Sequence, residues 1–256
     1  MDTYVAESFS DFSEYVTNLP FEYCLSRGQS EDYPLLPSGL RLDATGKRLY
    51  SKSTIDSFLE DFETEAVHFM DNPIASTSNW EWQVYAQHFG LPTRLLDFTY
   101  SHIISLMFAV EKAFSFEDGD NKNAVVWFLN PALLNREAGY TEGIINVSSH
   151  EHSMFTQKEE PVAIRAKKSN NRIAAQNGLF ISFVDNSKPL EEFPYADNIL
   201  KKVLIPHKSA KNILHTLYLM GMRHSNLYPE LASVSKDIIL KENVRQYIQN
   251  KEDNDD

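Results

Sequence analysis

The sequence lacks the residue patterns on which many common enzymes are built. Only one of its 256 residues is a cysteine, Cys24, which excludes an intrachain disulfide and a zinc site made from several cysteines. There is no H-E-x-x-H or H-x-x-x-H pair, no G-x-S-x-G elbow, no G-x-x-x-x-G-K-[ST] phosphate loop and no G-x-G-x-x-G turn. His150 and His152 are close together but lie in a polar stretch. We therefore expect no metal site.

Long apolar runs are also missing. No run approaches the roughly 18 residues that a membrane-spanning helix needs. The N-terminal stretch MDTYVAESFSDF is acidic and lacks the basic-then-apolar pattern of a secretion signal. We therefore expect a cytoplasmic protein with no membrane contact.

Positive charge is scarce. There are 24 Lys and Arg residues against 36 Asp and Glu residues, which gives a formal net charge of −12. Such a balance argues against a protein that coats a phosphate backbone. The short basic stretch from Arg165 to Lys168, with Arg172 nearby, leaves a local nucleic-acid contact open as a third choice.

The most informative stretch is residues 79–110. Ser78 and Glu81 have the spacing of a capping box, which predicts a helix that runs to His88. Gly90 and Pro92 would end that helix. Residues 93–99 are branched and aromatic and predict a short strand, and the apolar spacing from residue 101 onward predicts a second helix.

The rest of the chain predicts one α+β domain. Further helices are expected at residues 9–19, 51–70, 209–221 and 229–249, and strands at 21–26, 124–129, 161–165, 179–184 and 199–205. Residues 139–160 are irregular and predict a long surface loop. We expect a single domain over residues 1–242, with a mixed or antiparallel central sheet and flanking helices. Residues 243–256 are acidic and predict a disordered tail.

Polar residues gather at the junctions between these elements, where binding groups often lie. Arg27 and Gly28 follow the expected strand at 21–26, so a guanidinium and bare backbone could meet a carboxylate or phosphate; the alternative is a surface arginine in a turn. His88 would be the nearest general acid or base at neutral pH, but a histidine in a last helical turn also suits the helix dipole.

Two further groups keep structural alternatives open. Thr93 and Arg94 could bind a ligand, or Arg94 could form an internal ion pair with Asp97 that fixes the turn. Gln176, just before a glycine and an apolar strand, could point into a cleft or satisfy buried backbone groups.

Several of these segments occur in an order that resembles the FRG domain, which is named for a Phe/Tyr-Arg-Gly motif. The resemblance runs from about residue 5 to residue 240 and rests on residues 27–29, 33–38 and 86–99, and on Arg172 with residues 175–180. Ser26 stands where the family usually has an aromatic residue. The family occurs in bacteria and their phages, and its motifs imply no settled activity.

A weaker resemblance is to ADP-ribosyltransferases of the Arg-Ser-Glu type. Arg27-Gly28 looks like their first motif, and the strand ending at Thr99 with the helix after it looks like the second. The resemblance implies a split sheet in which Arg27 holds the pyrophosphate or ribose of NAD and Thr99 supports the nicotinamide pocket. Their catalytic Glu has a neutral counterpart here, Gln176, whereas Glu159 lies in a Q-x-E triplet elsewhere.

Two functions from different classes follow. In the first, a polar cleft binds a nucleotide such as NAD, with an ADP-ribosyltransferase-like reaction left open. The residues expected in that cleft are Arg27, Gly28, Gln29, His88, Thr93, Arg94, Asp97, Thr99 and Gln176, with Glu159 as a further catalytic candidate.

In the second, the domain is a non-catalytic interaction or regulatory module of a bacterium or phage that contacts a protein target. Either function would suit phage–host conflict. Convergence of the polar residues in one pocket would favour the first. The sequence does not fix the oligomeric state.

Overall fold

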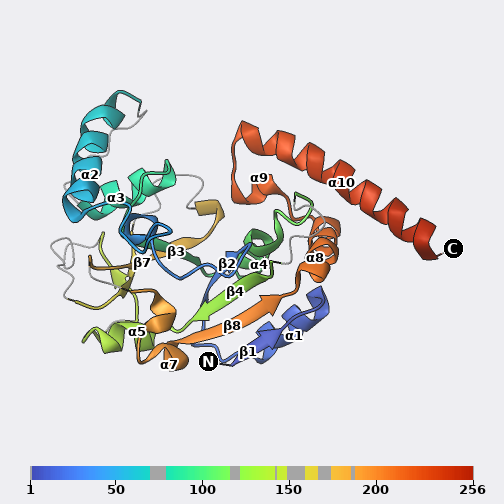
Figure 1. The fold of residues 1–256 in the computed structure, drawn as a ribbon, viewed down its shortest axis with the longest axis horizontal. Coiled ribbons are helices and arrows are strands. Elements are labelled where there is room, and N and C mark those ends of the chain that lie inside the picture. Colours follow the sequence, from blue (N-terminus) through green and yellow to red (C-terminus); the bar gives the residue numbers. More distant parts are fainter. Residues whose placement is uncertain are drawn as a thin grey trace.

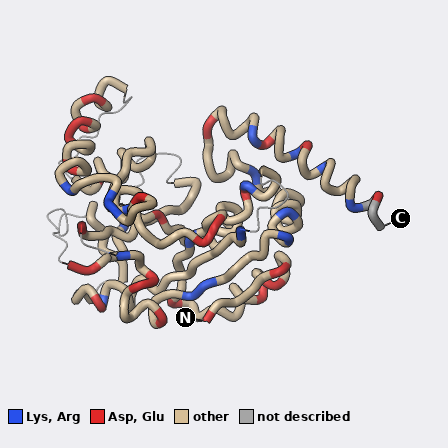
Figure 2. Tube along the Cα trace, viewed as in Figure 1, with Lys and Arg blue, Asp and Glu red and all other residues tan. Residues whose placement is uncertain are grey.

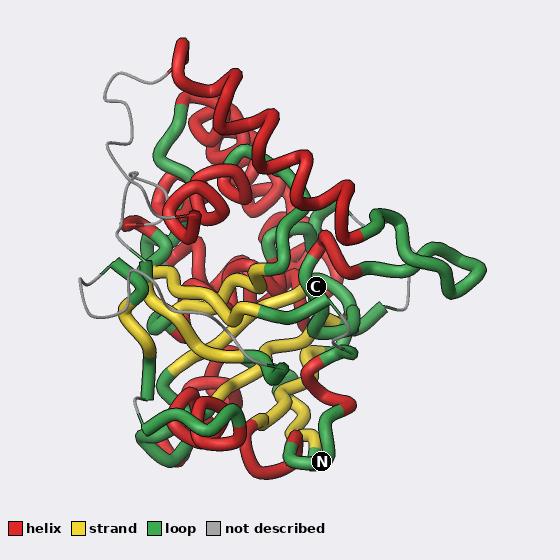
Figure 3. The backbone as a smooth tube through the Cα atoms, turned by 90° about the vertical axis from the view of Figure 1, so that its left-hand side faces the viewer, coloured by secondary structure: helices red, strands yellow, loops and turns green. Residues whose placement is uncertain are grey.

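The computed structural model describes residues 2–69, 79–115, 122–141, 143–148, 159–166, 174–185 and 188–255. Within these ranges eight strands form one sheet in the order β1-β8-β4-β2-β3-β7-β6-β5 (Figure 1). The sheet runs between helices on both of its faces (Figure 3). None of the described helices is long and apolar enough to cross a membrane.

The sheet is mixed, as the sequence predicted. Its strands are β1 Thr3–Val5, β2 Leu25–Gln29, β3 Leu95–Thr99, β4 Ala124–Leu129, β5 Ile145–Asn146, β6 Val162–Arg165, β7 Gly178–Ser182 and β8 Leu200–Ile205. The β1–β8 and β5–β6 pairs are parallel, and the other pairs are antiparallel. The α+β class is therefore confirmed.

The two central strands barely pair. β2 is joined to β3 at a single register pair, Ser26 with Thr99, whereas β2–β4 and β3–β7 each pair over five residues. The sheet is thus one hydrogen-bonded unit whose narrowest connection lies between β2 and β3. Its two four-stranded halves meet at a narrow seam, and we use "the seam" for this β2–β3 junction.

The longer helices lie close to where the sequence predicted them, whereas α7 and α9 were not predicted. The described helices are α1 Phe9–Asn18, α2 Lys52–Ala66, α3 Asn79–His88, α4 His102–Val110, α5 Pro131–Glu137, α7 Ala196–Ile199, α8 His207–Leu219, α9 His224–Leu227 and α10 Leu231–Asp255. Short 3₁₀ turns lie at Ser38–Leu40, Val67–Phe69 and Leu190–Glu192. The side chains of Ser8, Ser51 and Asn130 cap α1, α2 and α5, and Gly90 ends α3 with a φ of +89°.

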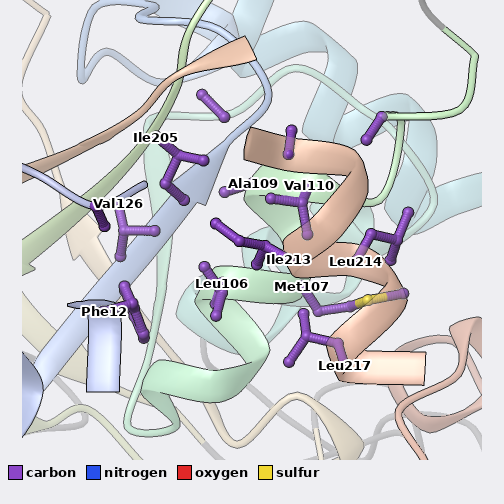
Figure 4. Packing of buried hydrophobic residues seen from close by; sticks show 14 of the residues in the cluster. Phe12, Leu106, Met107, Ala109, Val110, Val126, Ile205, Ile213, Leu214 and Leu217 are labelled. Atoms are coloured by element: carbon purple, nitrogen blue, oxygen red, sulfur yellow. The ribbon is translucent and has the colours of Figure 1, made fainter. Parts of the chain in front are cut away.

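Helix α4 is the centre of one core. Its buried residues pack between the sheet and α8, with Phe12 of α1 nearby (Figure 4). The contacting residues are Leu106, Met107 and Val110 of α4, Val126 and Ile205 of the sheet, and Ile213, Leu214 and Leu217 of α8. The opposite face of the sheet carries a second core around Leu25, Leu96 and Trp127. The sheet is therefore covered on both sides, which fixes its central strands.

The position of β2 differs from the prediction. The strand was expected at residues 21–26 with Arg27-Gly28-Gln29 as its polar exit, but β2 covers Leu25–Gln29. Phe21 is 91% exposed, so apolar residues there do not mark a buried strand. A Cβ on Gly28 would lie 1.8 Å from the carbonyl oxygen of Ser105, so only glycine lets α4 approach β2 this closely.

The C-terminal stretch also differs from the prediction. Helix α10 continues to Asp255, so residues 243–255 are helical where a disordered tail was expected. Leu240 and Val244 are buried against the body, and Arg245 bonds to Glu242 one turn earlier with a shortest N–O distance of 2.7 Å. Positive and negative residues alternate along the helix (Figure 2), which supports it in water. Asp256 lies outside the described residues.

The predicted loop at residues 139–160 is described only in part. The described portion includes the two-residue strand β5, which the sequence did not predict. β1 was not predicted either. Residues 142 and 149–158, with His150 and His152, lie outside the described residues.

Substituting Gly28 tests the close approach of α4 to β2. Gly28→Ala should lower the free energy of unfolding by about 3 kcal/mol or more, because a backbone oxygen occupies the position of the new methyl group. Gly143→Ala is the matched control, since its Cβ would meet Ala132 at an ordinary 3.6 Å. Urea unfolding of both variants measures the difference. Equal losses would contradict the proposed packing role.

Candidate functional site

A cavity of about 250 Å³ lies at the seam. It is lined by residues of β2, β3, β7, α3 and α4, and by Tyr228 just after α9. Six of the residues predicted from the sequence line it: Arg27, Gly28, His88, Asp97, Thr99 and Gln176. The structure therefore brings together residues that are up to 149 positions apart in the chain. We call this cavity "the seam pocket".

Arg27 is the only Lys or Arg among the described lining residues. Its Nη1 donates to the backbone carbonyl of Asp97 at 2.9 Å and lies 3.9 Å from the Asp97 carboxylate. The side chain is only 19% exposed, and its Nε has no hydrogen-bond partner among the described residues. Burial lowers the pKa of Arg27 and Asp97 opposes this, but arginine keeps its charge at neutral pH. The lining of the pocket thus includes one mostly buried cation.

Asp97 is held by a directed chain of hydrogen bonds. Its Oδ2 accepts from Nε2 of Gln87 at 2.7 Å, and Oε1 of Gln87 accepts from the Thr93 hydroxyl at 2.6 Å. The Thr93 hydroxyl in turn accepts from the backbone N–H of Leu95. Thr93 therefore supports Asp97 through Gln87 and does not line the pocket itself.

Arg94 lies elsewhere. Its Nε and Nη1 each bond at 2.9 Å to a carboxylate, that of Asp185 and that of Asp56 respectively. The sequence left open an ion pair with Asp97, but it is Arg27 that pairs with Asp97. Arg94 and Thr93 line a separate hollow between α2 and α3.

Two other predicted residues also lie outside the seam pocket. Gln29 is 7% exposed and its Oε1 accepts from the indole N–H of Trp127 at 3.1 Å, so it satisfies a buried donor. Glu159 is exposed just before β6 and is not among the residues that line the pocket.

Thr99 and Gln176 join the end of β3 to the start of β7. The Thr99 hydroxyl donates to the backbone carbonyl of Gln176 at 2.6 Å and accepts from the N–H of Ser101 at 2.9 Å. The side-chain amide of Gln176 donates to the carbonyl of Leu227 at 3.1 Å. Gln176 thus lines the pocket and also satisfies a backbone group, so both alternatives from the sequence hold.

His88 lines the pocket from the last turn of α3. Its ring meets that of Phe89 edge-on, with 4.8 Å between centroids. The His88 imidazole therefore borders the cavity in which the sequence analysis expected it.

Sequence reasoning missed the polar cluster behind Arg27. Ser26 Oγ lies 2.8 Å from Nδ1 of His102 and 2.8 Å from Oγ of Ser105. The His102 ring packs edge-on against Phe128, 5.0 Å between centroids. The serine at the aromatic position of the FRG motif was the available signal, because a small residue there leaves room for a histidine from α4.

An aromatic wall was missed as well. Phe108 and Tyr228 line the pocket with their ring centroids 5.9 Å apart at an interplanar angle of 72°. Phe108 fits the apolar stripe of α4, so its spacing indicated a core residue. Tyr228 lies far along the chain from the other lining residues and carried no local signal.

The comparison with protein families gives one result. The model of the FRG domain matches residues 23–118, which span β2, α2, α3, β3 and α4. This range supplies most of the pocket lining, whereas Gln176, Gly178, Phe180 and Tyr228 come from later in the chain. The chain matches no curated protein and no solved structure.

The cluster behind Arg27 should respond to pH. Burial lowers the pKa of His102, so as pH falls below about 6.5 the unfolded chain takes up this proton before the folded protein does. Stability should therefore decrease between pH 7.5 and 5 more steeply in the wild type than in His102→Gln, which has no titrating ring. Urea unfolding across this range measures both slopes. Parallel slopes would show that His102 does not contribute.

Proposed function

We propose that this chain, which carries an FRG domain over residues 23–118, binds a nucleotide of the NAD type in the seam pocket. The proposal rests on one observation above all: a buried guanidinium and an aromatic wall converge on the same cavity. Six of the residues expected in a polar cleft line this one cavity, and such convergence favours a binding site over a set of separate ion pairs.

Arg27 would bind the phosphate. A guanidinium presents five donors in a fixed fork that suits phosphate oxygens, and the Arg27 side chain lines the cavity. Gly28 plays a different part from the one that the sequence suggested. Its missing side chain makes room for α4 and not for a ligand.

The aromatic wall would hold the base. A flat heteroaromatic ring can stack on Phe108 or Tyr228, and stacking of this kind contributes about 1–3 kcal/mol per base. The cavity, at about 250 Å³, is below the roughly 300–1,000 Å³ of sites that enclose drug-sized ligands. It would therefore enclose one half of a dinucleotide and leave the other half outside.

The likeness to ADP-ribosyltransferases gains support from the same arrangement. Arg27 on β2 and Thr99 at the end of β3 both line the cavity, with α4 directly after β3. The turn just before β7, where the catalytic Glu would be expected, carries Gln176, whose amide donates to the carbonyl of Leu227. Any reaction of this type needs negative charge from another residue.

A protein-interaction module is the second candidate. Leu231, Val234 and Ile238 are 86%, 47% and 66% exposed, and their spacing puts them on one stripe of α10. An exposed apolar stripe on a long helix suits the groove or helix of a partner protein. Such a module would act in host or phage regulation without catalysis.

Calorimetric titration tests the nucleotide site. We expect NAD to bind the wild type saturably, and Arg27→Met to weaken binding at least tenfold, because a hydrogen bond to a charged group contributes about 1.5–3 kcal/mol. Methionine keeps the apolar stem and removes the charge. ADP-ribose and ATP, titrated in parallel, report whether the phosphates alone suffice.

The matched control is Arg245→Met on α10, which removes an exposed arginine that does not line the cavity and should leave the affinity unchanged. Urea unfolding of both variants checks that they fold. If none of the three nucleotides binds the wild type, the nucleotide site is wrong and the exposed stripe of α10 becomes the surface to study.

A further inference from the structure

The seam pocket contains a single acidic side chain among its described lining residues, that of Asp97. The turn before β7 supplies the neutral Gln176, and Glu159 is exposed and does not line the pocket. Asp97 is also the residue on which the hydrogen-bond chain from Leu95, Thr93 and Gln87 ends. The hydrogen bond from Gln87 therefore holds the Asp97 carboxylate at a fixed place in the pocket lining.

We infer that Asp97 is the catalytic carboxylate of the seam pocket, and that the pocket hydrolyses the N-glycosidic bond between a ribose and a pyridinium ring. The inference rests on the proposed binding of an NAD-type nucleotide and goes beyond it by naming the bond, the acceptor and the residue.

The single carboxylate among the described lining residues favours a bond whose leaving group needs no proton. Enzymes that cleave O-glycosides generally use two carboxyl groups, one to protonate the leaving oxygen and one to support the positive charge at the sugar carbon or to activate water. A pyridinium ring needs no proton to leave, because it departs as a neutral molecule when it takes the bonding electron pair. One carboxylate is therefore sufficient for this class of substrate.

The proposed hydrolysis needs water as its only co-reactant. The bond between C1′ and the ring nitrogen breaks and its electron pair goes to the nitrogen, which loses its positive charge. The oxygen of a water molecule bonds to C1′, and a proton from that water passes to the Asp97 carboxylate and then to solvent. The sum is NAD⁺ and water giving ADP-ribose, nicotinamide and H⁺, with no oxidant or reductant.

The exposure of Asp97 makes water available as the acceptor. Its side chain is 57% exposed, so solvent reaches the carboxylate directly. The Asp97 carboxylate, which lies 3.9 Å from the Arg27 guanidinium, would support an oxocarbenium-like transition state through its negative charge.

Gln87 and Thr93 are positioning residues for Asp97. Because the Thr93 hydroxyl accepts from Leu95, its own proton points to Oε1 of Gln87. This leaves the NH₂ group of Gln87 to face Asp97, so the amide cannot turn round without breaking both bonds. The backbone N–H of Leu95 thus fixes the orientation of the Asp97 carboxylate through the three hydrogen bonds that run by way of Thr93 and Gln87.

The decisive experiment combines binding with product release. Nicotinamide and ADP-ribose released from NAD are measured by chromatography for the wild type, Asp97→Asn and Glu159→Gln, and calorimetry gives the affinity of each for NAD. We expect release by the wild type and a loss of at least about 100-fold in kcat for Asp97→Asn, with the affinity for NAD changed by no more than about threefold. Asp61→Asn, an exposed residue of α2, is the control for loss of an acid.

The substrate provides a second control. NADH has nearly the same shape as NAD but its dihydropyridine ring is not a cationic leaving group. We expect NADH to compete with NAD for the pocket and to remain uncleaved. Cleavage of NADH at a similar rate would overturn the inference that leaving-group charge replaces a second carboxyl group.

The positioning residues have their own readout. Thr93→Val should lower kcat about tenfold while KM stays unchanged, because Gln87 loses the bond that orients it. Because the variant also removes the acceptor of the Leu95 N–H, some stability is lost in either case; a merely structural role would leave the kcat of the folded variant unchanged.

The outcomes separate the two proposals. If NAD binds but the wild type releases no nicotinamide, or if Glu159→Gln and not Asp97→Asn abolishes release, the catalytic inference is overturned and the nucleotide site stands. If NAD does not bind at all, the proposed function fails and the inference fails with it.

Discussion

The site depends on one pair of residues. Ser26 and Thr99 are the only register pair between β2 and β3, two strands that lie next to each other in the middle of the sheet. If the strands paired fully, their side chains would face helices above and below and no cavity could form between them. Because they diverge after one pair, polar groups from β2, β3 and β7 border the same space. Gly28 makes this arrangement stable, since it lets α4 pack directly on β2 and hold the two halves together.

Most polar groups around the seam both hold strands together and line the pocket. Thr99 and Gln176 connect β3 to β7 and also line the pocket. Arg27 satisfies a backbone carbonyl of β3 and keeps one donor without a partner among the described residues. Functional residues of this kind are hard to separate from structural ones by substitution, because removing them alters the fold and the site together. Variants that keep shape and remove charge are therefore the informative ones.

The sequence predicted much of this structure where the signal was local. Helix spacing, the cap at Gly90 and the apolar run of β4 each depend on neighbouring residues, and all are confirmed. What failed depended on distant partners. Arg94 could not be assigned to Asp185 because 91 residues separate them. Phe108 was indistinguishable from a core residue, since only Tyr228 beside it turns that position into a pocket wall. Six of the pocket residues were predicted from the sequence. That prediction came from the order of the motifs along the chain and not from the spacing of residues within them.

The contact of Arg27 with β3 has a further consequence. Where two strands part inside a sheet, the backbone groups along the opening form an internal edge that could pair with a foreign strand. Here the guanidinium donates to the carbonyl of Asp97, in the place that an amide of a neighbouring strand would take. A side chain thus closes the edge that the divergence of β2 and β3 creates, and the protein gains an opening in its sheet without offering a template for aggregation.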